Sequence, residues 1–308
     1  GITTYGKNLN LGFSTYALKI LFMLNKSEIT DKKNLDAWSY YINSYRRTLN
    51  PFPENSFIDD VMLDSYKNEN FKSQFKDGLK VFINKFSDKT YDTSNEKLLK
   101  GINAETKQAI STLQQIGYKS KLNFPINLST DDVIQKLNRL DWSKPWSAGA
   151  QYSSYCVYSK TQDTDYSQTL INFISGLVDE DTGSYFNKHP NNSREVINGA
   201  MKVITGLDWL DEKIHYPDKL IDYCLQNKPI EEGCDIVDFI YVLFKCSQQT
   251  NYKRDEVNKL MLEILGILEK LYRPEEKGFS YYNEKSQTYY YGVKIAEGKD
   301  CADIHGRS

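Results

Sequence analysis

Two small groups of titratable side chains are the residues of this sequence best suited to chemistry. Asp235 and Asp238 stand three positions apart in the apolar segment 234–246, so on a helix they share one face. Two carboxyl groups held close together can act as a general acid and base, or form part of a cation site. A structural alternative for Asp235 is that it stabilises the start of the helix, where a negative charge is favourable.

The second group, Asp303 and His305, stands near the end of the chain. The other two of the three histidines, His189 and His215, stand in polar segments. A histidine in the first turn of a helix could exchange protons near neutral pH, or it could be a hydrogen-bonded structural residue. Together with Cys301 this group could also bind a metal, but we recognise no metal motif in its spacing. We therefore predict neither a metal nor another cofactor.

Aromatic residues make up 13% of the chain, including 23 tyrosines, and could provide a binding surface. Tyrosine suits both helix–helix contacts and clefts that bind sugars, because it has an apolar ring and a polar tip. Trp146 and Tyr152 could therefore stack on a sugar ring or a lipid-like chain, or pack in the core. Three polar residues near expected helix starts are further binding candidates: Glu105, Gln151 and Asn198.

Helices must position all of these residues, because apolar side chains recur at helical spacing along most of the chain. The expected helices cover residues 8–25, 33–49, 64–86, 103–116, 130–140, the segment up to 158, 166–178, 194–207, 217–226, 234–246 and 255–271, and one more begins at 301. Residues 286–295 are the one candidate for a short hairpin. The pattern predicts an all-α protein of about twelve helices.

The expected helices are of two kinds, and their loops repeat. One kind begins with small residues and is apolar on all sides, which is typical of buried helices; the other is amphipathic or charged. The loops 181–186 and 276–281 both combine acidic residues, a glycine and aromatics, with glycines 95 positions apart, and 53–59 is a weaker relative. Such a period is typical of stacked helical hairpins. It favours an (α/α)6 toroid with inner and outer rings of helices.

In this alternation and these loops the chain resembles the α/α-toroid superfamily, which includes terpenoid cyclases, protein prenyltransferase β subunits and six-hairpin glycosidases and lyases. It lacks the Gln-Trp repeat. Segment 179–182 resembles the acidic motif of class II cyclases, but its final Asp is missing and Gly183 indicates a turn. The resemblance implies a pocket where the first turns of the inner helices converge. That pocket would gather Asn10, Ser14, Glu105, Gln108, Trp146, Gln151, Asn198, Asp235, Asp238, Asp303 and His305.

Composition limits the partners that this chain can have. The net charge is −2 over 308 residues and no basic cluster stands out, which argues against a nucleic-acid partner. No apolar run approaches the length of a membrane span, about 20 residues. The five cysteines are irregularly spaced without a CxxC motif, which favours free thiols and a cytoplasmic location. We expect residues 1–308 to form a single toroid domain, either complete or a piece of a longer chain.

These features favour a carbohydrate-active toroid enzyme, a hydrolase, lyase or epimerase that acts on a polysaccharide or glycan precursor. Asp235, Asp238, Asp303 and His305 would be catalytic, and Trp146, Gln151, Asn198, Tyr152 and Glu105 would bind the small-molecule or glycan ligand. Two alternatives stay open: a non-catalytic toroid that binds a protein or ligand, and a terpenoid- or prenyl-processing enzyme. A fold does not by itself specify which of these functions a protein has.

Overall fold

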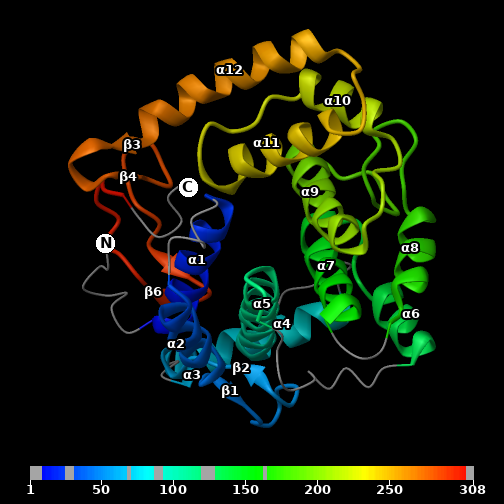
Figure 1. Cartoon of the computed structure of the whole chain (residues 1–308). Helices are drawn as coiled ribbons and strands as arrows, with labels where there is room; N and C mark the ends of the chain where they lie inside the picture. The colour runs from blue at the N-terminus through cyan, green and yellow to red at the C-terminus, as the bar shows by residue number, and fades with distance from the viewer. Residues whose placement is uncertain are drawn as a thin grey trace. The chain divides into compact units, whose positions relative to one another are not determined.

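The computed structural model describes residues 9–24, 31–67, 71–86, 93–118, 129–161 and 165–302 (Figure 1). Within these ranges the chain forms twelve α-helices and six strands of two residues each. The all-α class that the sequence predicts is therefore confirmed. The residues group into two compact units: 1–125 with 286–299, and 126–285 with 300–308. The expected ring of inner and outer helices, and the single domain over 1–308, stay predictions.

The first unit is built around its longest helix. Its helices are α1 (Asn10–Met23), α2 (Lys32–Asn43), α3 (Asp60–Lys67), α4 (Phe71–Phe86) and α5 (Ser94–Gln115); its hairpins are β1 (Arg46–Arg47) with β2 (Ser56–Phe57) and β5 (Tyr289–Tyr290) with β6 (Val293–Lys294). Helix α5 packs against α1, α3 and β2. It begins at a capping box, in which Thr93 and Glu96 bond each other's backbone N–H, a strong start signal.

One aspartate connects two distant segments of the first unit. Asp59 Oδ2 accepts hydrogen bonds from the backbone N–H groups of Asn10 and Leu11, both at 3.0 Å. These are orphan donors at the first turn of α1, so Asp59 stabilises a helix that begins 49 residues earlier. The expected helix 33–49 ends already at Asn43 because β1 pairs with β2 in this region.

In the second unit, three helices pack side by side and others cover them. The helices are α6 (Thr130–Asn138), α7 (Pro145–Thr161), α8 (Ser167–Ser175), α9 (Ser193–Leu210), α10 (Pro217–Gln226), α11 (Gly233–Ser247) and α12 (Arg254–Leu271). Helix α9 lies between α7 and α11, α8 packs on α7, and α10 and α12 pack on α11 (Figure 1). The unit ends in β3 (Tyr272–Arg273), the 3-10 helix η3 (Pro274–Glu276) and β4 (Gly278–Phe279).

The contact between α7 and α9 is close because small residues line it. A Cβ atom at Gly199 would lie 2.6 Å from the Cβ of Pro145, and one at Gly149 would lie 3.2 Å from the carbonyl oxygen of Gly199. Only glycine at position 199 lets the first turn of α7 touch the second turn of α9. The small residues that the sequence shows at these helix starts therefore serve helix packing.

Three loops share one local geometry. Each places a left-handed residue directly before its returning segment: Asn55 at φ 56°, Gly183 at φ 75° and Lys277 at φ 54°. Two positions later an aromatic residue pairs across the loop: Phe57 with Arg46, Tyr185 with Val178, and Phe279 with Tyr272. The structure thus aligns Gly183 with Lys277, 94 positions apart (277 minus 183), and not with Gly278. The three loops therefore share a left-handed backbone conformation. Glycine favours this conformation, but Asn55 and Lys277 adopt it too.

The acidic segment 179–182 forms a turn, as Gly183 indicated. Asp179 Oδ1 accepts hydrogen bonds from the Thr182 backbone N–H and hydroxyl, at 2.8 and 2.7 Å. The backbone N–H of Asp179 donates to the carbonyl oxygen of Ser184. Asp179 is therefore engaged within its own turn, a usual role for this residue type.

The substitution Gly199→Ala tests the close contact between α7 and α9. The added methyl group would lie within 3 Å of Pro145, so we expect the free energy of unfolding to fall by about 1–3 kcal/mol, as in overpacked cores. The matched control is Gly266→Ala in α12, where nothing lies within 4 Å of the new Cβ and stability should rise by up to about 1 kcal/mol. Urea unfolding measures both. Equal effects of the two substitutions would contradict the close contact.

Candidate functional site

A cavity of about 300 Å³ lies in the second unit at the first turns of α9 and α11. This volume is at the lower end of the range for small-molecule sites, about 300–1,000 Å³. Its apolar lining is Ile197, Pro229, Ile230 and Phe239, and its polar lining is Asn192, Ser193, Arg194, Asn198, Lys228 and Asp235. An apolar wall with a few convergent polar groups is typical of a ligand site.

Local signals position both helix starts at this cavity. Asn192 is the N-cap of α9, and its side chain accepts a hydrogen bond from the backbone N–H of Glu195 at 2.9 Å, a favoured arrangement. Helix α11 begins at Gly233, whose φ of 66° suits glycine. Four polar residues of the lining therefore lie at the helix starts: Asn192, Ser193, Arg194 and Asp235. Asn198 lies one turn further along α9, and Lys228 lies in the loop between α10 and α11.

Asp235 connects these two helices. Its Oδ1 accepts hydrogen bonds from Arg194 Nε at 2.7 Å and from Asn198 Nδ2 at 2.6 Å, both on α9. Its side chain is nearly fully buried. Its hydrogen-bond partners are thus side chains of the neighbouring helix and not the backbone of α11, so its contacts go beyond those of a local helix cap.

Trp146 lies against Arg194, which binds Asp235 in the same chain of contacts. The Arg194 guanidinium carbon lies 4.9 Å from the centroid of the Trp146 ring, a cation–π distance. The backbone N–H of Trp146 donates to Glu195 Oε2 at 3.2 Å, which places a negative charge at the start of α7. Trp146 therefore holds Arg194 in place and is not among the residues that line the cavity.

Asp238, one turn further along α11, has a different environment. It is buried, its Oδ2 lies 4.0 Å from Lys202 Nζ, and that oxygen has no hydrogen bond to any residue that the structure describes. Burial raises the pKa of its carboxyl group to about 6, although the charge of Lys202 opposes the shift. Asp238 does not line the cavity. Asp235 and Asp238, the predicted acid pair, therefore lie on one face of α11 but have different neighbours.

The other predicted site residues lie apart from this cluster. Tyr152 is fully buried against Trp142 and its hydroxyl donates to the carbonyl oxygen of Leu170 at 3.4 Å, so it packs in the core. Gln151 is half-buried on α7. Glu105 belongs to the first unit, where it accepts a hydrogen bond from the Tyr290 hydroxyl and burial raises its pKa to about 7. Asp303 and His305 lie outside the described residues.

The cavity also contains residues that the sequence analysis did not select. Arg194 and Lys228 supply its positive charges, and Phe239 and Ile230 supply part of its apolar wall. A signal for Arg194 exists in the sequence: it precedes Asn198 by four positions, so the two side chains lie on one helix face in successive turns. Lys228 and Ile230 lie between helices and offer no such periodicity.

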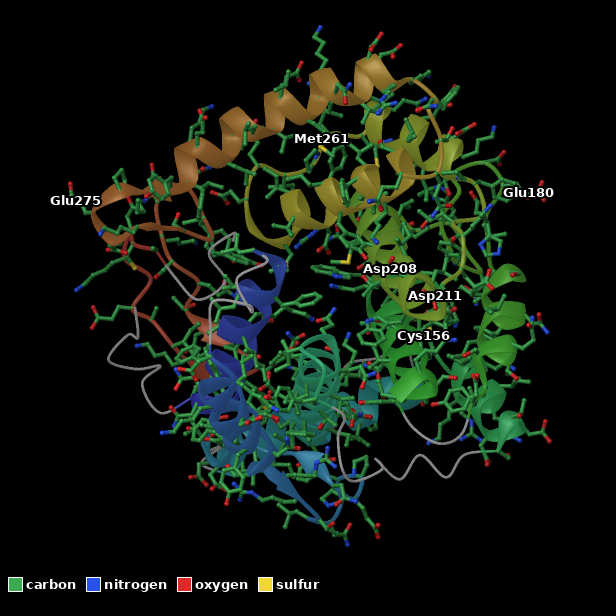
Figure 2. All side chains as sticks on the ribbon, viewed as in Figure 1. Cys156, Glu180, Asp208, Asp211, Met261 and Glu275 are labelled. Atoms are coloured by element: carbon green, nitrogen blue, oxygen red, sulfur yellow. The ribbon has the colours of Figure 1, made fainter. Side chains whose placement is uncertain are left out.

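A second cavity, of about 510 Å³, lies between α11 and α12 and has a different chemistry. Met261 (Figure 2) and other apolar residues line it, and Asn258 is its one polar lining residue. Leu262 in this lining is 70% exposed, so the cavity is an open groove. This open groove is therefore not the deep central cavity that a terpenoid-processing enzyme needs.

A scan against protein-family models, a search of curated proteins and a search of solved structures each found no match to this chain. The resemblance to the α/α-toroid superfamily therefore stays a prediction. Within the described ranges, no helix has the length and apolar character needed to cross a membrane. Among the same residues, no cluster of three or more His, Cys, Asp or Glu side chains has the arrangement of a metal site.

The buried carboxyl group of Asp238 should make stability depend on pH. Its pKa is about 6 in the folded protein and 3.8 ordinarily, so between these values the folded state binds more protons than the unfolded state. The free energy of unfolding therefore falls as the pH rises from about 4 to 6. The substitution Asp238→Asn removes this contribution.

Thermal unfolding of both proteins between about pH 4 and pH 7 tests this expectation. The Tm of Asp238→Asn minus that of the unaltered protein should increase as the pH rises. Glu105 titrates in both proteins, so its contribution cancels in the difference. A difference that stays constant with pH would show that Asp238 does not titrate in a buried environment.

Proposed function

We propose that the protein binds a carbohydrate in the cavity between the first turns of α9 and α11. The observation that carries this proposal is the fixed pair of Asp235 and Asn198 beside an apolar wall. Asp235 Oδ2 and Asn198 Oδ1 accept no hydrogen bond from any described residue. Both oxygens are therefore available to the hydroxyl groups of a ligand.

The apolar wall supports the same ligand class. A sugar ring presents C–H groups as well as hydroxyls, and the C–H groups pack favourably on apolar side chains. Ile230 and Phe239 provide such a surface within the cavity. A site that pairs oriented polar groups with an apolar wall discriminates strongly among ligands, because an unmatched buried polar group is costly.

Catalysis on the bound carbohydrate, as a hydrolase, lyase or epimerase, is the second candidate function. Asp238 favours it, because a carboxyl group with a pKa of about 6 beside an ion-paired Asp235 resembles the divided roles of acid–base pairs. Binding stands first because Asp238 does not line the cavity. The two candidates differ in one outcome: only catalysis requires that Asp238→Asn abolish turnover while binding persists.

Binding is tested by calorimetry with a panel of sugars and oligosaccharides. We expect Asp235→Asn to weaken binding at least tenfold, because it removes the charge that holds Arg194 and Asn198. Ile230→Trp should also block binding by filling the cavity, and Ile230 is 56% exposed, so this variant should fold. Product analysis of the same mixtures, with Asp238→Asn alongside, reports on catalysis.

The matched control is Asp208→Asn. Asp208 (Figure 2) forms an exposed ion pair with Lys245 at 2.5 Å near the far end of α9. It stands ten positions beyond Asn198, about 15 Å along a helix, so this change should leave binding unaltered. If no sugar binds the unaltered protein, or if Asp235→Asn and Ile230→Trp both bind as it does, the proposal is wrong.

The proposal also places the protein in the cytoplasm. None of the five cysteines, all of which the structure describes, forms a disulfide, and Cys156, Cys224 and Cys246 are buried. Burial raises the pKa of the Cys246 thiol to about 12, which keeps it protonated and unreactive. Buried thiols outside any disulfide support a reducing compartment.

A further inference from the structure

We infer that the ligand of this cavity carries an oxoanion, namely a carboxylate, phosphate or sulfate group, which the two terminal guanidinium nitrogens of Arg194 bind. This inference rests on the proposed function and specifies its ligand as an acidic carbohydrate. It comes from Arg194, whose contacts orient it fully but use only part of its hydrogen-bonding capacity.

Two contacts fix the Arg194 guanidinium group. Its Nε donates to Asp235 Oδ1 at 2.7 Å, and its central carbon lies 4.9 Å from the centroid of the Trp146 ring. The ion pair and the cation–π contact together restrain the group, so it cannot rotate freely. The loss of side-chain entropy that usually opposes binding by arginine has therefore already occurred.

The terminal nitrogens of this group remain available. Nη1 and Nη2 of Arg194 donate no hydrogen bond to any residue that the structure describes, although Arg194 lines the cavity and its side chain is 48% exposed. Two parallel N–H donors on one rigid plane match the two oxygens of a carboxylate, phosphate or sulfate. A hydroxyl group would use only one of them.

The positive groups of the lining are Arg194 and Lys228, and its one carboxylate is Asp235. Lys228 is paired with Glu263 at 2.7 Å. Arg194 is paired with Asp235 through Nε alone, so its terminal nitrogens make it the principal anion contact. Asn192 and Ser193 bring the start of the 18-residue helix α9 to the same cavity, and a helix start adds partial positive charge.

A purely structural role for Arg194 makes different predictions from an anion site. In that role Arg194 would join α7, α9 and α11 through Trp146 and Asp235, and its replacement would alter stability alone. As an anion site, Arg194 must alter the preference among ligands. The substitution Arg194→Lys separates the two roles, because lysine keeps the charge beside Asp235 but lacks the two-pronged donor edge.

The experiment compares neutral sugars with their acidic counterparts by calorimetry at low ionic strength. The pairs are glucose with glucuronate, galactose with galacturonate, and glucose with its 6-phosphate and 6-sulfate. We expect at least one acidic member to bind tenfold or more tightly than its neutral counterpart, and the three acidic groups to show which oxoanion is preferred. In Arg194→Lys and Arg194→Gln most of this preference should disappear, while neutral binding changes less than about threefold.

Two controls accompany these measurements. Arg254→Lys makes the same chemical change at the start of α12, where Arg254 is exposed and donates to Asn251, and it should leave the preference intact. Inorganic phosphate and acetate alone should shift the Nε–H resonance of Arg194 in nitrogen-15 spectra. That resonance is assigned by its loss in Arg194→Lys.

Each outcome decides between the two proposals. Neutral and acidic sugars that bind equally well would overturn the oxoanion inference and leave carbohydrate binding standing, as would an acidic preference that survives both Arg194 variants. If no sugar binds, the carbohydrate proposal fails. In that case the phosphate and acetate titrations decide the oxoanion site separately: a shifted Arg194 resonance supports it, and an unmoved resonance overturns it.

Discussion

The close approach of α7 and α9 is the constraint on which the second unit depends. Gly199 permits it, because any larger side chain would collide with Pro145. A glycine inside a helix costs about 1 kcal/mol relative to alanine, and the packing of two helix starts offsets that cost. The contact also has a chemical consequence: it places Trp146 of α7 beside Arg194 of α9, so a steric feature of the backbone orients a charged side chain.

From Arg194 the same chain of contacts continues to α11 through Asp235. Transferring an ion pair out of water has a large desolvation cost, so such a pair contributes more to geometry than to net stability. Here it sets the position of α11 relative to α9 and leaves one oxygen of Asp235 and two nitrogens of Arg194 open. Asp238, three positions further, has only Lys202 at 4.0 Å. Asp235 and Asp238 share one helix face but differ in their partners, because their neighbours come from different turns of α9.

These contacts explain why ligand binding fits the structure better than a ready-made catalytic pair. Asp235, Asn198 and Arg194 line one cavity, whereas Asp238 is buried and does not line it. The first unit has its own buried acid, Glu105, whose partner Tyr290 reaches it from a hairpin 185 residues later. That hydrogen bond is part of the packing of α5, since a buried carboxyl group requires a partner.

The sequence by itself determined the local features. Apolar spacing predicted the helices, Gly183 predicted a turn, and the i, i+3 spacing placed Asp235 and Asp238 on one face, because each depends on interactions within a few residues. The tertiary structure alone decided the partners. It aligned Gly183 with Lys277 through backbone shape, placed Tyr152 in the core and Trp146 against Arg194, and brought Lys228 to the cavity. The physical reason is that these contacts join residues far apart in the chain, and helical periodicity says which face a side chain occupies but not which helix that face meets.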